Sequence, residues 1–228
     1  MTTETIVCPW CPMPTPVKAG GNFCVEHEGE AEARARRERE AEVQQNRREW
    51  LAVIGVPRAQ HGFTFSSLDE TRPVQIVKAY RPLVFHGRAL VLLGPTGVGK
   101  TAASVALLDS MLPDFQTRQR YDLGMTLMRH LHDFDTCDGA MDRCARARLL
   151  VIDDLPRHRD DERVAGLIDE ILIIRESERR ATIIISNVTP KSLTTLLSDR
   201  VMDRLKTWGN VHSVTGPSLR RAPEGKEA

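Results

Sequence analysis

Short apolar runs alternate with stretches of helical periodicity from about residue 63 onward. The runs cover residues 89–93, 148–152 and 181–186, are rich in Val, Ile and Leu, and are too short for helices. Such runs are typical of strands buried on both faces. Between them, residues 101–111, 123–132 and 164–172 carry apolar side chains at helical spacing. The alternation predicts an α/β fold, with a parallel sheet covered by helices.

Two weaker strands complete the expected sheet. One is a short strand before Tyr121, and the other covers residues 211–215. Only about a dozen residues follow the last strand, so we expect no C-terminal helical lid.

A different pattern precedes this region. Residues 28–50 are rich in Glu and Arg, contain no Pro, and bring opposite charges to i,i+3 and i,i+4 positions. This predicts a solvated helix that Pro57 and Gly62 end, either as an adaptor or as a linker without a partner. We expect three segments: a small module at 1–27, a charged helical connector at 28–60, and the α/β domain at 61–228.

The composition bounds the class of protein. The chain has 228 residues, of which 41% are hydrophobic and 28% charged, enough to bury a core. It contains no apolar run long enough for a bilayer and no signal-peptide pattern, so we expect a cytoplasmic protein without membrane contact. A net charge of +1 gives no sign of a generally basic nucleic-acid binder, and any such surface must be local.

A glycine-rich loop follows the first apolar run and opens the next helix. It matches the pattern G-x-x-x-x-G-K-[ST], in which backbone N–H groups surround phosphate groups at a helix N-terminus. We expect Lys100 to reach the β and γ phosphates and Thr101 to bind Mg²⁺. The setting between strand and helix argues against a chance turn and predicts binding of ATP or GTP. The expected nucleotide-binding residues are Gly94, Pro95, Thr96, Gly97, Val98, Gly99, Lys100 and Thr101.

Polar residues follow the next two apolar runs. Asp153 is the expected partner of Thr101 in binding Mg²⁺. Asp154 stands where ATP-hydrolysing proteins of this fold carry the carboxylate that polarises the attacking water, usually a Glu. Asn187 reaches the same sheet edge, where an amide can orient water or the γ-phosphate. With Lys100 these are the expected catalytic residues; the alternative is an aspartate pair that caps a turn.

Cysteines cluster near the N-terminus. Cys8 and Cys11 form C-x₂-C, and after twelve residues Cys24 and His27 form C-x₂-H. Four soft ligands in two pairs suit tetrahedral Zn²⁺, and a closed set predicts a structural ion that the module needs to fold. A redox pair and incidental cysteines are the alternatives.

Two further cysteines lack such a pairing. Cys137 and Cys144 are expected to be packing residues.

Together these motifs resemble AAA+ proteins of the DnaC type, the bacterial and phage replicative-helicase loaders, and their IstB-type transposition relatives. The resemblance covers about residues 60–221 and is most specific at 198–205, S-D-R-V-M-D-R-L, and at 216–220, G-P-S-L-R. It implies an AAA+ P-loop NTPase that binds ATP. It also implies an arginine finger acting on a neighbouring subunit's ATP, with Arg204 as the matched residue and Arg200 as the alternative. Arg220 matches the family's terminal arginine, expected near the nucleotide, although Leu219 replaces the family's aromatic residue.

The resemblance also implies a function. We expect an ATPase, weak alone and stimulated by assembly or DNA, that binds the replicative DNA helicase through its N-terminal part and single-stranded DNA through its ATPase domain. Two alternatives are a transposase-associated ATPase on duplex DNA and a nucleotide-binding zinc scaffold without turnover. A small-molecule kinase fits poorly, because Asn187 and Arg204 would have no role in it.

Overall fold

The computed structural model describes residues 25–155 and 162–219. The chain divides into two units, residues 1–47 and 48–228. No helix among the described residues is long and apolar enough to cross a membrane. The elements in chain order are α1 (Val25–Val53), η1 (Arg58–Gln60), α2 (Arg72–Val84), β1 (Ala89–Leu93), α3 (Lys100–Ser110), α4 (Leu112–Phe115), η2 (Gln116–Arg118), β2 (Gln119–Leu123), α5 (Gly124–His132), α6 (Phe134–Arg146), β3 (Leu149–Asp153), α7 (Glu162–Ser177), β4 (Ala181–Ser186), α8 (Pro190–Leu196), α9 (Asp199–Trp208) and β5 (Gly209–Ser213).

Helix α1 confirms the predicted charged helix and crosses the division between the two units. Exposed ion pairs at i,i+4 run along it, with 2.9 Å between Arg34 Nε and Glu38 Oε1 and 3.0 Å between Arg36 Nε and Glu40 Oε1. Such pairs add a few tenths of a kcal/mol each, roughly 0.3–0.5. The helix begins at Val25, before the predicted start at residue 28.

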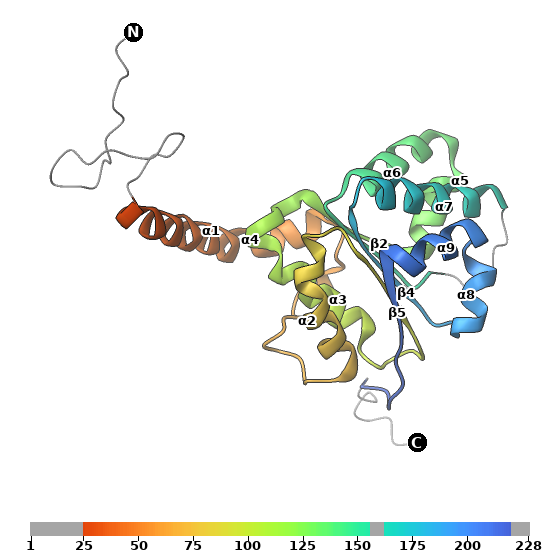
Figure 1. Ribbon diagram of the computed structural model, residues 1–228, viewed down its shortest axis with the longest axis horizontal. Coiled ribbons are helices and arrows are strands. Elements are labelled where there is room, and N and C mark those ends of the chain that lie inside the picture. The colour runs from red at the N-terminus through yellow and green to blue at the C-terminus, as the bar shows by residue number, and fades with distance from the viewer. Residues whose placement is uncertain (1–24, 156–161, 220–228) are drawn as a thin grey trace, which may run out of the picture. The chain divides into compact units, whose positions relative to one another are not determined.

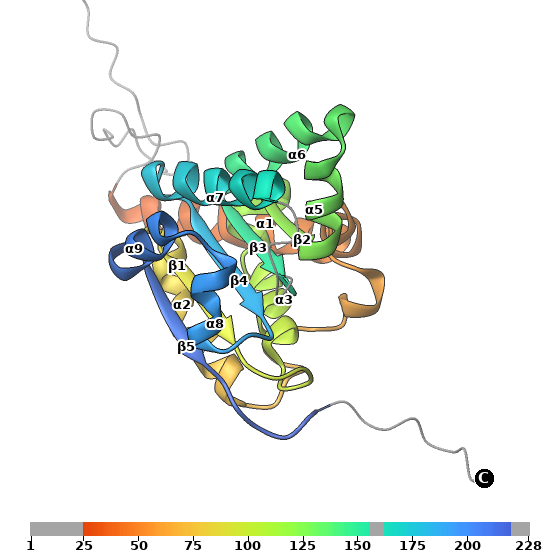
Figure 2. The ribbon, with the colours of Figure 1, turned by 90° about the vertical axis from the view of Figure 1, so that its right-hand side faces the viewer.

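Five parallel strands form one sheet in the described part of the chain, in the order β2-β3-β4-β1-β5 (Figure 2). Every neighbouring pair is parallel, as the alternating pattern predicts. The carboxyl ends of β1, β3 and β4 therefore meet at one edge, because strands β1 and β3 both pair with β4.

Helices cover both faces of this sheet (Figure 1). Helices α2 and α3 contact strands on one face. Helices α5 to α9 cover the other, where they share a single core cluster with alternate residues of β1 and β3. Cys137 and Cys144 lie in that cluster, which confirms them as packing residues.

Other details also differ from the sequence prediction. Tyr121 lies within β2 rather than after a strand, and β5 begins at Gly209, two residues before the predicted start. Helix α6 was not predicted, because only Cys137, Ala140 and Cys144 of its residues are buried and these three side chains are small. The Asp133 side chain starts that helix by accepting a hydrogen bond from Asp135 N.

A fully buried arginine joins three elements of the core. Arg175 on α7 donates to the carbonyl oxygens of Cys144 (2.6 Å) and Ala147 (2.8 Å) at the end of α6, and to Thr182 Oγ1 on β4 (2.8 Å). Burial lowers its pKa to about 9, so the guanidinium stays charged at neutral pH. The last carbonyl groups of a helix lack intrahelical donors and carry partial negative charge, and Arg175 supplies both the donors and the charge.

We expect Arg175→Lys to lower the free energy of unfolding by at least about 2 kcal/mol, because one ammonium nitrogen cannot reach α6 and β4 together and leaves buried acceptors unsatisfied. Urea unfolding measures the change. Arg146→Lys is the control, since Arg146 is exposed and pairs with Asp142 on its own helix. If both variants unfold at the same urea concentration, this role of Arg175 is contradicted.

Candidate functional site

The predicted phosphate loop connects β1 to α3. Gly94, Gly97 and Gly99 all have positive φ angles, of 143°, 88° and 96°. A Cβ atom at Gly94 would lie 2.0 Å from Val214 O, and one at Gly97 would lie 2.2 Å from Ser218 Oγ. Only glycine fits this loop without strain. Of the other predicted residues, Pro95, Thr96 and Val98 lie in the loop, and Lys100 and Thr101 begin α3.

The Lys100 ammonium is buried at the centre of the loop. Its Nζ donates to Gly94 O (2.7 Å), Pro95 O (2.8 Å) and Asn187 Oδ1 (3.0 Å). Burial lowers the pKa of Lys100, and Asp153 and Asp154 oppose that change. All of these acceptors are oxygen atoms, so phosphate oxygens can replace them around the ammonium.

Asp153 at the end of β3 is buried, and each of its oxygen atoms has a donor. Thr101 Oγ1 donates to Oδ1 at 3.1 Å, and the Tyr121 hydroxyl donates to Oδ2 at 2.5 Å. Burial raises the pKa of Asp153, while these two hydrogen bonds lower it. A hydroxyl and a carboxylate side by side at the first turn of α3 are hard oxygen ligands, which fit Mg²⁺.

Asn187 connects the loop to the second aspartate. While its Oδ1 accepts from Lys100, its Nδ2 donates to Asp154 Oδ1 at 2.6 Å. Asp154 is exposed and has a left-handed backbone conformation, with φ at 55°. The structure thus brings Lys100, Thr101, Asp153, Asp154 and Asn187 together at one sheet edge, as the sequence predicts.

A cavity of about 630 Å³ opens beside these residues, within the usual size of a small-molecule site. Its lining carries the Lys100 ammonium and the carboxylates of Asp69, Asp153 and Asp154. Apolar side chains line it as well, namely Ala59, Phe63, Leu68, Val74 and Leu219. The ammonium and the glycine loop suit phosphates, and the apolar side chains suit a base.

The sequence analysis did not identify two groups of residues at this cavity. The segment 59–74 carries no motif, because a base wall needs only apolar surface. Tyr121 lies in a strand that was recognised only in outline, and its contact with Asp153 arises from the pairing of β2 with β3. No local sequence pattern predicts either group of residues.

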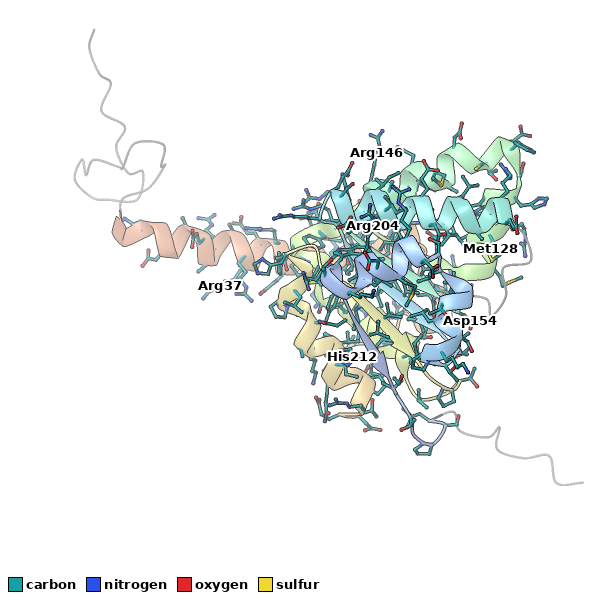
Figure 3. The ribbon with its side chains drawn as sticks, turned by 45° about the vertical axis from the view of Figure 1, so that its right-hand side comes forward. Arg37, Met128, Arg146, Asp154, Arg204 and His212 are labelled. Atoms are coloured by element: carbon teal, nitrogen blue, oxygen red, sulfur yellow. The ribbon has the colours of Figure 1, made fainter. Side chains whose placement is uncertain are left out.

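The predicted finger residue does not line the cavity. Arg204 lies on α9, apart from Asp154 (Figure 3), with Nη1 3.6 Å from Glu176 Oε2 on α7. Arg200 is exposed on the same helix. Among the described residues that line the cavity, Lys100 is the only Lys or Arg. Arg220 lies outside the described residues.

Three of the four predicted zinc ligands, Cys8, Cys11 and Cys24, lie outside the described residues. The fourth, His27, is on the first turn of α1, with its Nε2 4.0 Å from Glu30 Oε2. Within the described residues, no group of three or more His, Cys, Asp or Glu side chains is placed to hold a metal ion. The zinc module stays a prediction.

The parallel sheet of order β2-β3-β4-β1-β5, with its phosphate loop after β1 and its aspartates after β3, defines a P-loop NTPase domain of the AAA+ class. The chain belongs to the IstB-like ATP-binding protein family, whose family model matches residues 18–226. No curated protein sequence matched the chain.

Solved structures share the fold. A DnaC helicase loader has 19% identity and a TM-score of 0.58, covering 70% of this chain and 100% of its own. DnaI has 22% identity and a TM-score of 0.59, and the match covers 72% of this chain and 94% of DnaI. A replication initiator DnaA, bound to AMPPCP and single-stranded DNA, has 17% identity and a TM-score of 0.57, covering 68% and 50%. The chain therefore spans about half the length of that DnaA.

We expect Gly97→Ala to weaken ATP binding about tenfold, because a left-handed conformation costs a residue with a Cβ roughly 1–2 kcal/mol. Titration of a fluorescent ATP analogue measures the affinity.

Gly166→Ala on α7 is the matched control, since a Cβ there meets nothing within 4 Å. It is expected to keep ATP affinity and to raise stability by about 0.5–1 kcal/mol. Wild-type affinity in the Gly97 variant would show that the loop tolerates a side chain.

Proposed function

We propose that this protein is an ATP-hydrolysing switch that binds the replicative DNA helicase and single-stranded DNA during replication. The observation that carries the proposal is the meeting of Lys100, Asp153, Asp154 and Asn187 beside one cavity of nucleotide size. Membership of an ATP-binding family supports ATP as the nucleotide.

Each residue has a role in the proposed hydrolysis. Lys100 exchanges its contacts with Gly94 O and Pro95 O for phosphate oxygens. Thr101 and Asp153 would hold Mg²⁺, and the ion would supply positive charge that neutralises the transferred phosphoryl group. Asp154 accepts the proton of the attacking water, and Asn187 keeps that carboxylate beside the phosphate loop.

Assembly supplies the missing positive charge in this proposal. Phosphoryl transfer is accelerated by a guanidinium near the γ-phosphate, and Lys100 is the only basic side chain among the described residues of the cavity. Arg204 is one third exposed and is paired with Glu176 in its own chain. A neighbouring subunit's Arg204 would complete the site after leaving that pair.

An exposed aromatic residue supports the single-stranded DNA partner. Phe134 is 80% exposed, and the Arg163 guanidinium carbon lies 4.3 Å from the centroid of its ring. Exposed Arg129 and His132 precede it at the end of α5. Aromatic rings beside cations stack unpaired bases, which duplex DNA does not offer.

The proposal of a helicase as partner depends on similarity to other proteins. One similar structure is described as a DnaC helicase loader, and the likeness shows the fold alone. The N-terminal part, with the predicted zinc ligands Cys8, Cys11, Cys24 and His27, is the proposed adaptor for the helicase.

Two alternative functions differ from this proposal, one in the type of DNA that is bound and the other in whether ATP is hydrolysed. A transposase-associated ATPase of the IstB kind would assemble on duplex DNA. A zinc scaffold would bind nucleotide without hydrolysing it, an option that Asp154 in place of the usual Glu leaves open.

ATP turnover without DNA, with single strands and with duplex separates the three functions. We expect single strands to stimulate ATP turnover by the wild type. We expect Lys100→Ala to abolish turnover, and Arg204→Ala to lower it by at least about a hundredfold. Arg146→Ala, at an exposed arginine on α6, is the control and should match wild type.

Stimulation by duplex alone would favour the transposition function. Absence of turnover under all conditions would favour the scaffold. Unchanged turnover in Arg204→Ala would exclude that residue as the finger.

We expect Phe134→Ala to weaken binding of a labelled oligothymidine about tenfold, since stacking contributes roughly 1–3 kcal/mol per base. Fluorescence anisotropy measures it. Phe85→Ala is the control, because Phe85 is 55% exposed and packs on Phe115. Equal affinities of the two variants would move the DNA surface elsewhere.

A further inference from the structure

Tyr121 is a buried residue of β2 that belongs to no nucleotide-binding motif. Its side chain is 1% exposed, and its hydroxyl group donates to Asp153 Oδ2 at 2.5 Å. This contact places the Tyr121 hydroxyl behind Asp153, the aspartate that is expected to bind Mg²⁺.

The hydroxyl proton has one available direction. A carboxylate oxygen can only accept, so the single proton of the Tyr121 hydroxyl is directed to Asp153 Oδ2. The two donors of Asp153 then occupy different oxygen atoms, Tyr121 at Oδ2 and Thr101 at Oδ1.

The backbone of Tyr121 is fixed on both sides. Strand β2 pairs with β3, where Tyr121 is opposite Val151, two residues before Asp153. On its other side, Tyr121 N donates to Ile54 O at 2.7 Å. The phenol ring therefore approaches Asp153 from a rigid position, as a positioning group requires.

We propose that Tyr121 is a positioning residue: its hydroxyl holds Asp153 Oδ2 so that Oδ1 stays beside Thr101 Oγ1, available to the divalent cation that accompanies the nucleotide. The inference rests on the proposed function, and it adds a residue to that site. A carboxylate rotates easily about its last bond, whereas Mg²⁺ demands near-ideal ligand geometry. Loss of a partner behind a metal ligand typically weakens metal binding about 10–100-fold.

Tyr121→Phe tests the proposal, because it removes the hydroxyl group and keeps the ring. The affinity for a fluorescent ATP analogue is measured in EDTA and over a Mg²⁺ titration. We expect the Mg²⁺ concentration at half-effect to rise about tenfold, with unchanged affinity in EDTA.

Tyr80→Phe is the matched control. Tyr80 is the other tyrosine of the chain and is also buried. Its hydroxyl donates to the carbonyl oxygen of Arg88, with that of Thr182 also near at 3.4 Å, and neither residue lines the cavity. It should keep the wild-type response to Mg²⁺, whatever it does to thermal stability.

The outcomes are distinct. Equal Mg²⁺ responses in Tyr121→Phe and wild type overturn the positioning role, and so does an equal loss of affinity with and without Mg²⁺, which indicates general distortion. A wild type that binds no nucleotide in any condition overturns the proposed function itself.

Tyr121→Met decides the matter if Tyr121→Phe does not fold. It also removes the hydroxyl group, and its flexible side chain can fill the space of the ring, so the Mg²⁺ response should shift in the same direction. An unshifted response in a folded Tyr121→Met protein overturns the proposal.

Discussion

The ends of three strands are tied together by one amide group. Asn187, after β4, accepts from the Lys100 ammonium after β1 and donates to the Asp154 carboxylate after β3. An amide is the only neutral side-chain group that can serve a cation with an oxygen and an anion with a nitrogen at once. Every functional contact of the cavity depends on these strand ends keeping their spacing.

Two buried polar side chains help to secure that spacing. At the opposite end of the sheet, Arg175 fixes the start of β4 to the end of α6. At the same end as the cavity, the pairing of β2 with β3 carries Tyr121 to Asp153. The hydrogen bonds of both side chains are directional, so they restrict the register of the elements more sharply than apolar packing does.

Much of the architecture could be predicted because its signals are local. Continuous apolar runs predicted β1, β3 and β4, and the glycine spacing predicted the phosphate loop. The polar residues that follow β3 and β4 predicted Asp153, Asp154 and Asn187. Contacts between distant segments left no such signal. The Tyr121 hydroxyl, the apolar wall before α2 and the pairing of Arg204 with Glu176 each depend on which elements become neighbours. Helix α6 was not predicted because only three of its residues are buried and their side chains are small.

The charges that line the cavity have a consequence for the ionic form of its ligand. Asp69, Asp153 and Asp154 are among the lining residues, whereas Lys100 is the only basic side chain among the described residues that line it. Like charges repel strongly where water is partly excluded. A bare triphosphate would meet this surplus of negative charge, whereas its magnesium complex carries less negative charge and brings its own cation to the carboxylates. Under the proposed function, the site would therefore bind metal-complexed nucleotide in preference to the free anion.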